Sequence, residues 1–265
     1  MATKRRPELK RNALERAQDL IYEAWEAHSL EAGVALARRA LEVSPDCADA
    51  YVYLAAHTAR SHREAMDLYQ KGIEAGERAL GEEFFQENAG YFWGILETRP
   101  YMRARASLAQ CLWEAGRSEE SFAHYWELLR LNPNDNQGLR YLLLPRLIEM
   151  GRDAEAERLF KSYQDDAMAV WLYSKALLDF RAGGDGPKAR KSLKAALKEN
   201  PHVPPYLLGA KRLPRSLPAF YGFGDENEAI LYVHEAKKGW RKSQGALAWL
   251  GAHADVPPRA SRSRP

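Results

Sequence analysis

Three prolines constrain the fold of this chain more than any other feature, because each follows an amphipathic helical pattern. They are Pro45, Pro133 and Pro201, preceded by the segments Ala-Leu-Glu-Val-Ser, Leu-Leu-Arg-Leu-Asn and Ala-Leu-Lys-Glu-Asn. The second and third are separated by two periods of about 34 residues, and the first and second by two such periods plus about 20 extra residues. Proline disrupts a helix because it lacks a backbone N–H and its ring clashes with the preceding turn. The chain is therefore predicted to be a series of helix pairs repeated about every 34 residues.

A 34-residue period of paired helices is typical of tetratricopeptide repeats. It predicts an all-α fold: a tetratricopeptide-type α-solenoid, a right-handed superhelix of helix hairpins, with a C-terminal helical cap. We expect about five repeats within residues 10–203, at roughly 14–47, 48–80, 102–135, 136–167 and 170–203. The segment 1–9 is predicted to be a flexible basic N-terminus, 204–254 a capping block that covers the apolar face of the last repeat, and 255–265 a disordered basic tail.

The extra residues form an insert at 81–101 that is rich in aromatic side chains. It contains Phe84, Phe85, Tyr91, Phe92 and Trp93. So many aromatic rings are unfavourable in water, so we expect the insert to pack as a helical extension on the solenoid. Docking of a partner by these rings is the alternative.

The composition, 46% hydrophobic and 28% charged, is that of a folded soluble protein. No apolar run approaches the roughly 20 residues of a membrane-spanning helix, and the basic N-terminus lacks the apolar core of a signal peptide. We therefore expect a cytoplasmic protein with no membrane insertion. Cys47 and Cys111 are the two cysteines, and their spacing indicates neither a disulfide framework nor a zinc site.

No enzymatic activity and no cofactor are predicted. The sequence contains no phosphate-binding loop, nucleophile elbow or paired Cys/His nucleophile. One group of possible metal ligands lacks the spacing of a known metal motif, and its carboxylates are favourable at a helix start for electrostatic reasons. That group consists of His202, Asp225, Glu226, Glu228 and His234. We predict no metal site.

The candidate partner-binding residues come from the first helices of repeats three to five. In a solenoid of this type those helices line the concave face, and repeat positions 2, 5, 6, 9 and 12 point away from the hairpin seam. The positions that we predict to bind a partner are Arg103, Gln110, Gln137, Arg140, Tyr141, Trp171, Lys175 and Arg181. This set is cationic and aromatic, which suits an acidic peptide segment. The alternative is that Trp113 and Trp171 pack in the core and that the arginines are solvated.

The predicted function is a non-enzymatic scaffold that binds a protein or peptide segment. On this hypothesis, Arg103→Glu with Arg140→Glu abolishes partner capture without lowering the melting temperature. The alternative is a nucleic-acid-associated helical-repeat protein that uses its basic tails. Because the region between the basic ends is net negative, nucleic acid is the less favoured partner.

Some stretches are more distinctive than a generic repeat. They include Tyr91-Phe92-Trp93-Gly94, Leu131-Asn132-Pro133-Asn134, and a terminal block with His202-Val203-Pro204, Tyr206-Leu207-Leu208 and Gly224-Asp225-Glu226-Asn227-Glu228-Ala229. Together they resemble a bacterial tetratricopeptide family related to the eukaryotic suppressor-of-tumorigenicity-seven proteins. The resemblance covers roughly residues 30–250 and implies a repeat fold without assigned catalytic residues.

Overall fold

The computed structural model describes the backbone of residues 5–256 and the side chains of residues 13–256. The predictions made for residues 1–4 and 257–265 therefore fall outside the described part of the chain. Within that part, the regular structure is entirely helical. The chain divides into two compact units, Met1–Leu139 and Arg140–Pro265, which we call unit 1 and unit 2.

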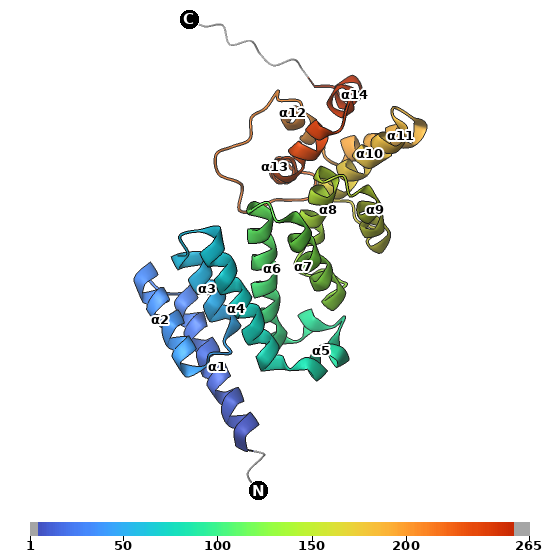
Figure 1. Ribbon diagram of the computed structural model, residues 1–265. Helices are drawn as coiled ribbons and strands as arrows, with labels where there is room; N and C mark the ends of the chain where they lie inside the picture. Colours follow the sequence, from blue (N-terminus) through green and yellow to red (C-terminus); the bar gives the residue numbers. More distant parts are fainter. Residues whose placement is uncertain (1–4, 257–265) are drawn as a thin grey trace, which may run out of the picture. The chain divides into compact units, whose positions relative to one another are not determined.

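Unit 1 consists of stacked helix hairpins (Figure 1). Its helices are α1 (Arg5–Trp25), α2 (Leu30–Val43), α3 (Ala48–Thr58), α4 (His62–Leu80), α5 (Glu82–Asn88), α6 (Arg99–Glu114) and α7 (Ser118–Leu131), with 3-10 turns at Phe92–Gly94 and Leu96–Thr98. The pairs α1/α2, α3/α4 and α6/α7 form the hairpins, and the first helix of each, here called the A helix, packs on the A helix of the next. The hairpins match the first three predicted repeats.

Local sequence signals set the ends of these helices. The hydroxyl of Ser29 accepts a hydrogen bond from the backbone N–H of Ala32 at 3.2 Å, and Ser61 caps α4 in the same way. Such caps satisfy backbone donors that a helix start leaves without partners. At the other end of α2, the chain turns at Ser44 and reaches Pro45, as the sequence predicts.

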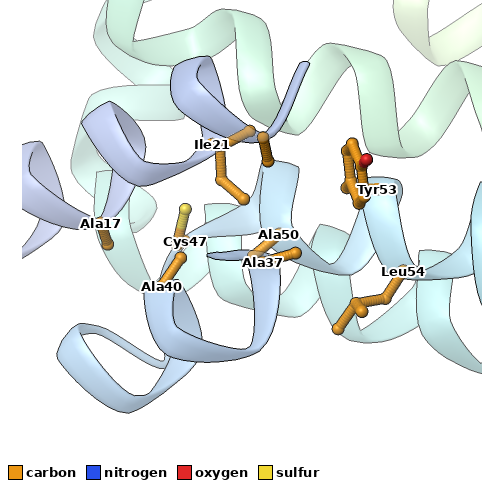
Figure 2. Packing of buried hydrophobic residues seen from close by; sticks show 9 residues of the cluster. Ala17, Ile21, Ala37, Ala40, Cys47, Ala50, Tyr53 and Leu54 are labelled. Atoms are coloured by element: carbon orange, nitrogen blue, oxygen red, sulfur yellow. The ribbon is translucent and has the colours of Figure 1, made fainter. Parts of the chain in front are cut away.

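The core of the first hairpins is built largely from small side chains. Figure 2 shows Ala17 and Ile21 of α1 facing Ala37 and Ala40 of α2, with Cys47 beside them. Small residues allow the helices of a hairpin to approach closely. Burial, the largest influence, raises the pKa of the Cys47 thiol to about 12, so this cysteine is a packing residue.

Glycine is required where α4 meets α6. A Cβ atom added at Gly76 would lie 2.8 Å from Cβ and 3.2 Å from Cα of Tyr101, and Tyr101 is almost fully buried. A real Cβ does not approach another atom so closely. The tight contact of these two helices therefore depends on the missing side chain.

The aromatic insert packs on unit 1. Phe92 is fully buried, and its ring lies 5.0 Å from that of Phe85 and 6.2 Å from that of Tyr101 on α6. The hydroxyl of Thr98 donates to the carbonyl of Phe92, which fixes the turn between them. Tyr91 remains 75% exposed. Most of the insert is thus a structural element of unit 1, in agreement with the packing alternative.

Unit 2 begins with two further hairpins, α8/α9 and α10/α11, followed by three helices. Its helices are α8 (Arg140–Glu149), α9 (Asp153–Ser162), α10 (Ala169–Gly183), α11 (Pro187–Glu199), α12 (Val203–Leu207), α13 (Glu226–Lys242) and α14 (Ala246–His253). Proline at the first position of α11 suits a helix start. The two hairpins match the fourth and fifth predicted repeats.

The helix α13 lies against α8 and α10, the A helices of unit 2. Gly239 of α13 permits this contact, because a Cβ there would meet the side chain of Ile148 at 3.3 Å. The buried guanidinium of Arg146 on α8 reaches Glu235 of α13 at 3.4 Å. The sequence predicts that the terminal block covers the last repeat, whereas its longest helix packs across the A helices of both hairpins.

None of the helices in the described residues combines the length and the apolarity that a membrane span requires.

Candidate partner-binding surface

The predicted binding residues at the start of unit 2 are held by the chain itself. Nε of Arg140 donates to Asp166 at 2.9 Å, and the hydroxyl of Tyr141 donates to the same carboxylate at 2.8 Å. The guanidinium also lies 5.0 Å from the ring of Tyr163. Burial, followed by the hydrogen bond to Asp166, raises the pKa of Tyr141. This cluster joins α8 to the segment before α10, which is a structural role.

The predicted binding residues on α10 are likewise engaged within unit 2. The ring of Trp171 is 3% exposed and lies 4.8 Å from the ring of Phe160. Lys175 forms an ion pair with Asp179. Arg181 donates to the carbonyl of Ile148 at 2.8 Å and pairs with Asp153 at 3.2 Å. A partner would have to displace these contacts.

Arg103, in unit 1, has a different environment. It lies on α6 and donates from Nε and Nη2 to the two carboxylate oxygens of Asp49 on α3, at 2.8 and 2.5 Å. Asp49 is fully buried and also accepts from Gln18 of α1 at 2.9 Å. Burial acts to lower the pKa of Arg103, but the hydrogen bonds and charge of Asp49 outweigh it and raise that pKa. The side chain of Arg103 nevertheless remains 34% exposed.

Two aromatic side chains adjoin this ion pair. The guanidinium of Arg103 lies 5.5 Å from the ring centroid of Trp25, and the rings of Tyr22 and Trp25 are 5.7 Å apart. Tyr22 is 52% and Trp25 45% exposed. We call Tyr22, Trp25 and Arg103 the aromatic–arginine surface of unit 1. Its residues lie on α1 and α6, the A helices of the first and third hairpins. Asp49 of α3, the A helix of the second hairpin, holds Arg103 in place.

The sequence prediction included Arg103 but missed Tyr22 and Trp25. The signal was present: counted from residue 14, where the first repeat begins, Tyr22 and Trp25 occupy positions 9 and 12, the same positions that define the predicted set. They were missed because the set was taken only from repeats three to five.

The two predicted glutamines of unit 1 are not among the residues that define the aromatic–arginine surface. Gln110 donates to Glu114 at 2.7 Å and accepts from the hydroxyl of Tyr125 at 3.3 Å. Gln137 lies in the turn that follows α7.

The terminal block that carries the resemblance is a structural junction of unit 2. The carboxylate of Asp225 caps α13 by accepting from the backbone N–H of Glu228 at 2.8 Å, and Glu228 in turn accepts from the N–H of Gly224, the residue before the cap, at 2.8 Å. Glu228 is 4% exposed and also accepts from Nδ2 of Asn200 and from the N–H of Ala169, both at 2.8 Å. The motif thus joins α13 to the start of α10 and the end of α11. No group of three potential metal ligands occurs among the described residues.

The hairpin architecture defines a helical-repeat protein of the tetratricopeptide class. A solved structure described as "YrrB: a TPR protein with an unusual peptide-binding site" is similar, with a TM-score of 0.50 and 21% sequence identity, over 72% of this chain and 92% of that one. The family model described as ST7 protein matches residues 9–256, so the chain belongs to the ST7 family.

Curated relatives agree with this assignment. The chain is 26% identical over 279 residues to the "Suppressor of tumorigenicity 7 protein-like" of Gallus gallus, covering 93% of this chain and 49% of that protein. It is 26% identical over 289 residues to the "Protein ST7 homolog" of Caenorhabditis elegans, covering 93% and 52%. The chain therefore spans about half the length of the curated relatives it matches.

Proposed function

We propose that the protein is a non-enzymatic interaction scaffold that binds a segment of a partner protein on the aromatic–arginine surface of unit 1. The observation that carries this proposal is the pair of half-exposed rings of Tyr22 and Trp25 beside Arg103. Tyrosine, tryptophan and arginine are the residues that dominate binding energies at protein interfaces.

The surface is preorganised, which lowers the entropic cost of binding. Asp49 fixes the guanidinium of Arg103 through two hydrogen bonds, and Gln18 fixes Asp49. Because a guanidinium has five N–H donors, Arg103 retains donors that these two bonds do not use.

A suitable partner segment carries an aliphatic or proline side chain and an acidic residue. The apolar side chain would pack on the rings of Tyr22 and Trp25, and a carboxylate would accept from the remaining donors of Arg103. An acidic residue would have to compete with Asp49, so we assign most of the binding energy to the rings.

Of the eight partner-binding residues predicted from the sequence, the proposal uses Arg103. Gln110 and Gln137 stay predictions. We assign the other five a structural role because each is buried or bonded within unit 2: Arg140, Tyr141, Trp171, Lys175 and Arg181. A cytoplasmic location and a bacterial branch of the ST7 family also stay predictions.

Affinity capture with matched baits tests the proposal. The full chain, a Tyr22→Ala/Trp25→Ala variant and a Tyr91→Ala/Leu96→Ala control are used, each with and without nuclease. The control removes two side chains that are even more exposed, 75% and 66%, but lie in the insert. A protein retained by the full chain and the control, lost from the first variant and indifferent to nuclease, supports the proposal. Equal retention by all three baits refutes it.

A further inference from the structure

The connection between α12 and α13 exposes an unusual set of side chains. Residues 211–223, here called the 211–223 loop, run without regular structure between these helices (Figure 1). Four large apolar residues in this loop are exposed: Leu217 by 42%, Phe220 by 85%, Tyr221 by 48% and Phe223 by 59%. Exposed apolar side chains gathered in this way mark interaction sites.

The 211–223 loop is also cationic. It contains Lys211, Arg212 and Arg215 and no acidic residue. Lys211 pairs with Glu226 at 2.5 Å, whereas Arg212 and Arg215 are exposed and have no ion pair within the described residues. The loop therefore suits a partner surface that combines negative charge with aromatic side chains.

The aromatic end of the loop is fixed in place. The N–H of Gly222 donates to Asp225 at 2.6 Å, and Asn227 donates to the carbonyl of Phe220 at 3.0 Å. Two prolines, Pro214 and Pro218, further restrict the backbone of the loop. Less conformational freedom is therefore lost when the loop binds.

The same chain carries a surface of the complementary kind on α1. Asp19, Tyr22 and Glu23 share one side of the helix by their spacing, Glu26 follows directly after its last residue, and all four are exposed. The carboxylates form no ion pair within the described residues, and Trp25 lies beside them. Two cations adjoin this side: Arg16 of α1, a turn earlier, and Arg103 of α6, whose guanidinium is already paired with Asp49.

We propose that the 211–223 loop of one molecule binds the acidic and aromatic side of α1 in a second copy of this chain. The inference rests on the proposed function, because it names a partner that uses the rings of Tyr22 and Trp25; this partner binds the carboxylates of α1 and leaves the donors of Arg103 unused. The rings of Phe220 and Phe223 pack against Tyr22 and Trp25, while Arg212 and Arg215 face Asp19, Glu23 and Glu26. The two surfaces differ, so the contact is heterologous and repeats from copy to copy.

Sedimentation velocity on the full chain between about 1 and 500 µM tests the inference. The contact joins two small sets of side chains, so it is expected to be weak, with a Kd on the order of 10–100 µM. Phe220→Ser/Phe223→Ser removes the loop side, and Tyr22→Ser/Trp25→Ser removes the helix side. Each is expected to weaken association by at least about tenfold, whereas Tyr91→Ser/Leu96→Ser is the matched control and leaves it unchanged. Circular dichroism confirms that each variant is folded.

Mixing the loop-side variant with the helix-side variant gives a more specific test of the contact. Each of the two variants keeps one intact side, so an equimolar mixture is expected to form a dimer that does not grow further. Charge reversal supplies a second test: Asp19→Lys/Glu26→Lys weakens association, and added Arg212→Glu/Arg215→Glu restores it. A wild-type chain that stays monomeric at 500 µM, or a mixture that does not dimerise, overturns the inference. If partner capture still depends on Tyr22 and Trp25 in that case, the proposed function stands without it.

Discussion

Replacing Arg103 with methionine should destabilise the protein, because it leaves the fully buried carboxylate of Asp49 without its counter-ion. Asp49 then keeps the hydrogen bond from Gln18 and loses the two from Arg103. Hydrogen bonds to charged groups contribute about 1.5 kcal/mol or more each, and breaking a buried ion pair costs about 3–5 kcal/mol. Water can reach a side chain that is one-third exposed, so we expect the lower end, about 3 kcal/mol. At about 3 °C per kcal/mol, the melting temperature should fall by roughly 9 °C.

A second substitution should recover part of this loss. Asp49→Asn removes the buried charge, so Asp49→Asn/Arg103→Met should melt above Arg103→Met alone. Arg117→Met is the matched control, because Arg117 pairs with Glu120 while both side chains are about half exposed. Such a pair contributes less than about 1 kcal/mol. The reasoning is refuted if Arg103→Met melts like the control, or if the double variant is less stable than Arg103→Met.

The structure also changes one expectation from the sequence: Arg103→Glu/Arg140→Glu should lower the melting temperature, since both arginines pair with aspartates that are nearly inaccessible.

Two further predictions concern packing and pH. Gly76→Ala should destabilise unit 1 by about 1–3 kcal/mol despite the better helix propensity of alanine, because its Cβ would press on the backbone of Tyr101; a thermal melt at or above the wild-type value would contradict this. Burial and then the charge of Arg105 lower the pKa of His124 to about 4. The unfolded chain therefore binds the extra proton first, and stability should fall as the pH drops from 6.5 to 4, by about 1–2 kcal/mol because solvent screens this partly exposed ring. Urea midpoints at pH 7.5 and 4.5 measure this loss, and His124→Gln should reduce it; an equal loss in the variant would show that other groups are responsible.

Much of the fold follows from signals that are local in the sequence. Pro45, Pro133 and Pro201 mark hairpin ends because proline acts on the residues next to it, and Ser29 and Ser61 start helices through bonds to residues three positions later. The positions of these helix ends need no knowledge of distant contacts. The sequence pattern was sufficient there.

The environment of the predicted binding residues could not be derived from local sequence signals in the same way. Repeat positions indicate which side of a helix a residue occupies, but not whether an aspartate from another helix pairs with it. Asp166 follows Arg140 by 26 residues and Asp49 precedes Arg103 by 54, so no local pattern announces either pair. The packing of α13 on α8 was missed for the same reason, since Arg146 and Glu235 are 89 residues apart.

That long-range packing has a consequence for folding. Each hairpin of unit 1 can gain its contacts from its sequence neighbours, as is usual in repeat arrays, where structure spreads from one repeat to the next. In unit 2, α8 and α10 reach their full burial only when α13 arrives. During synthesis at about 5–20 residues per second, the apolar side of α8 therefore remains exposed for several seconds until α13 has been made. Contacts between distant segments also slow folding, so unit 2 is expected to complete its folding after unit 1.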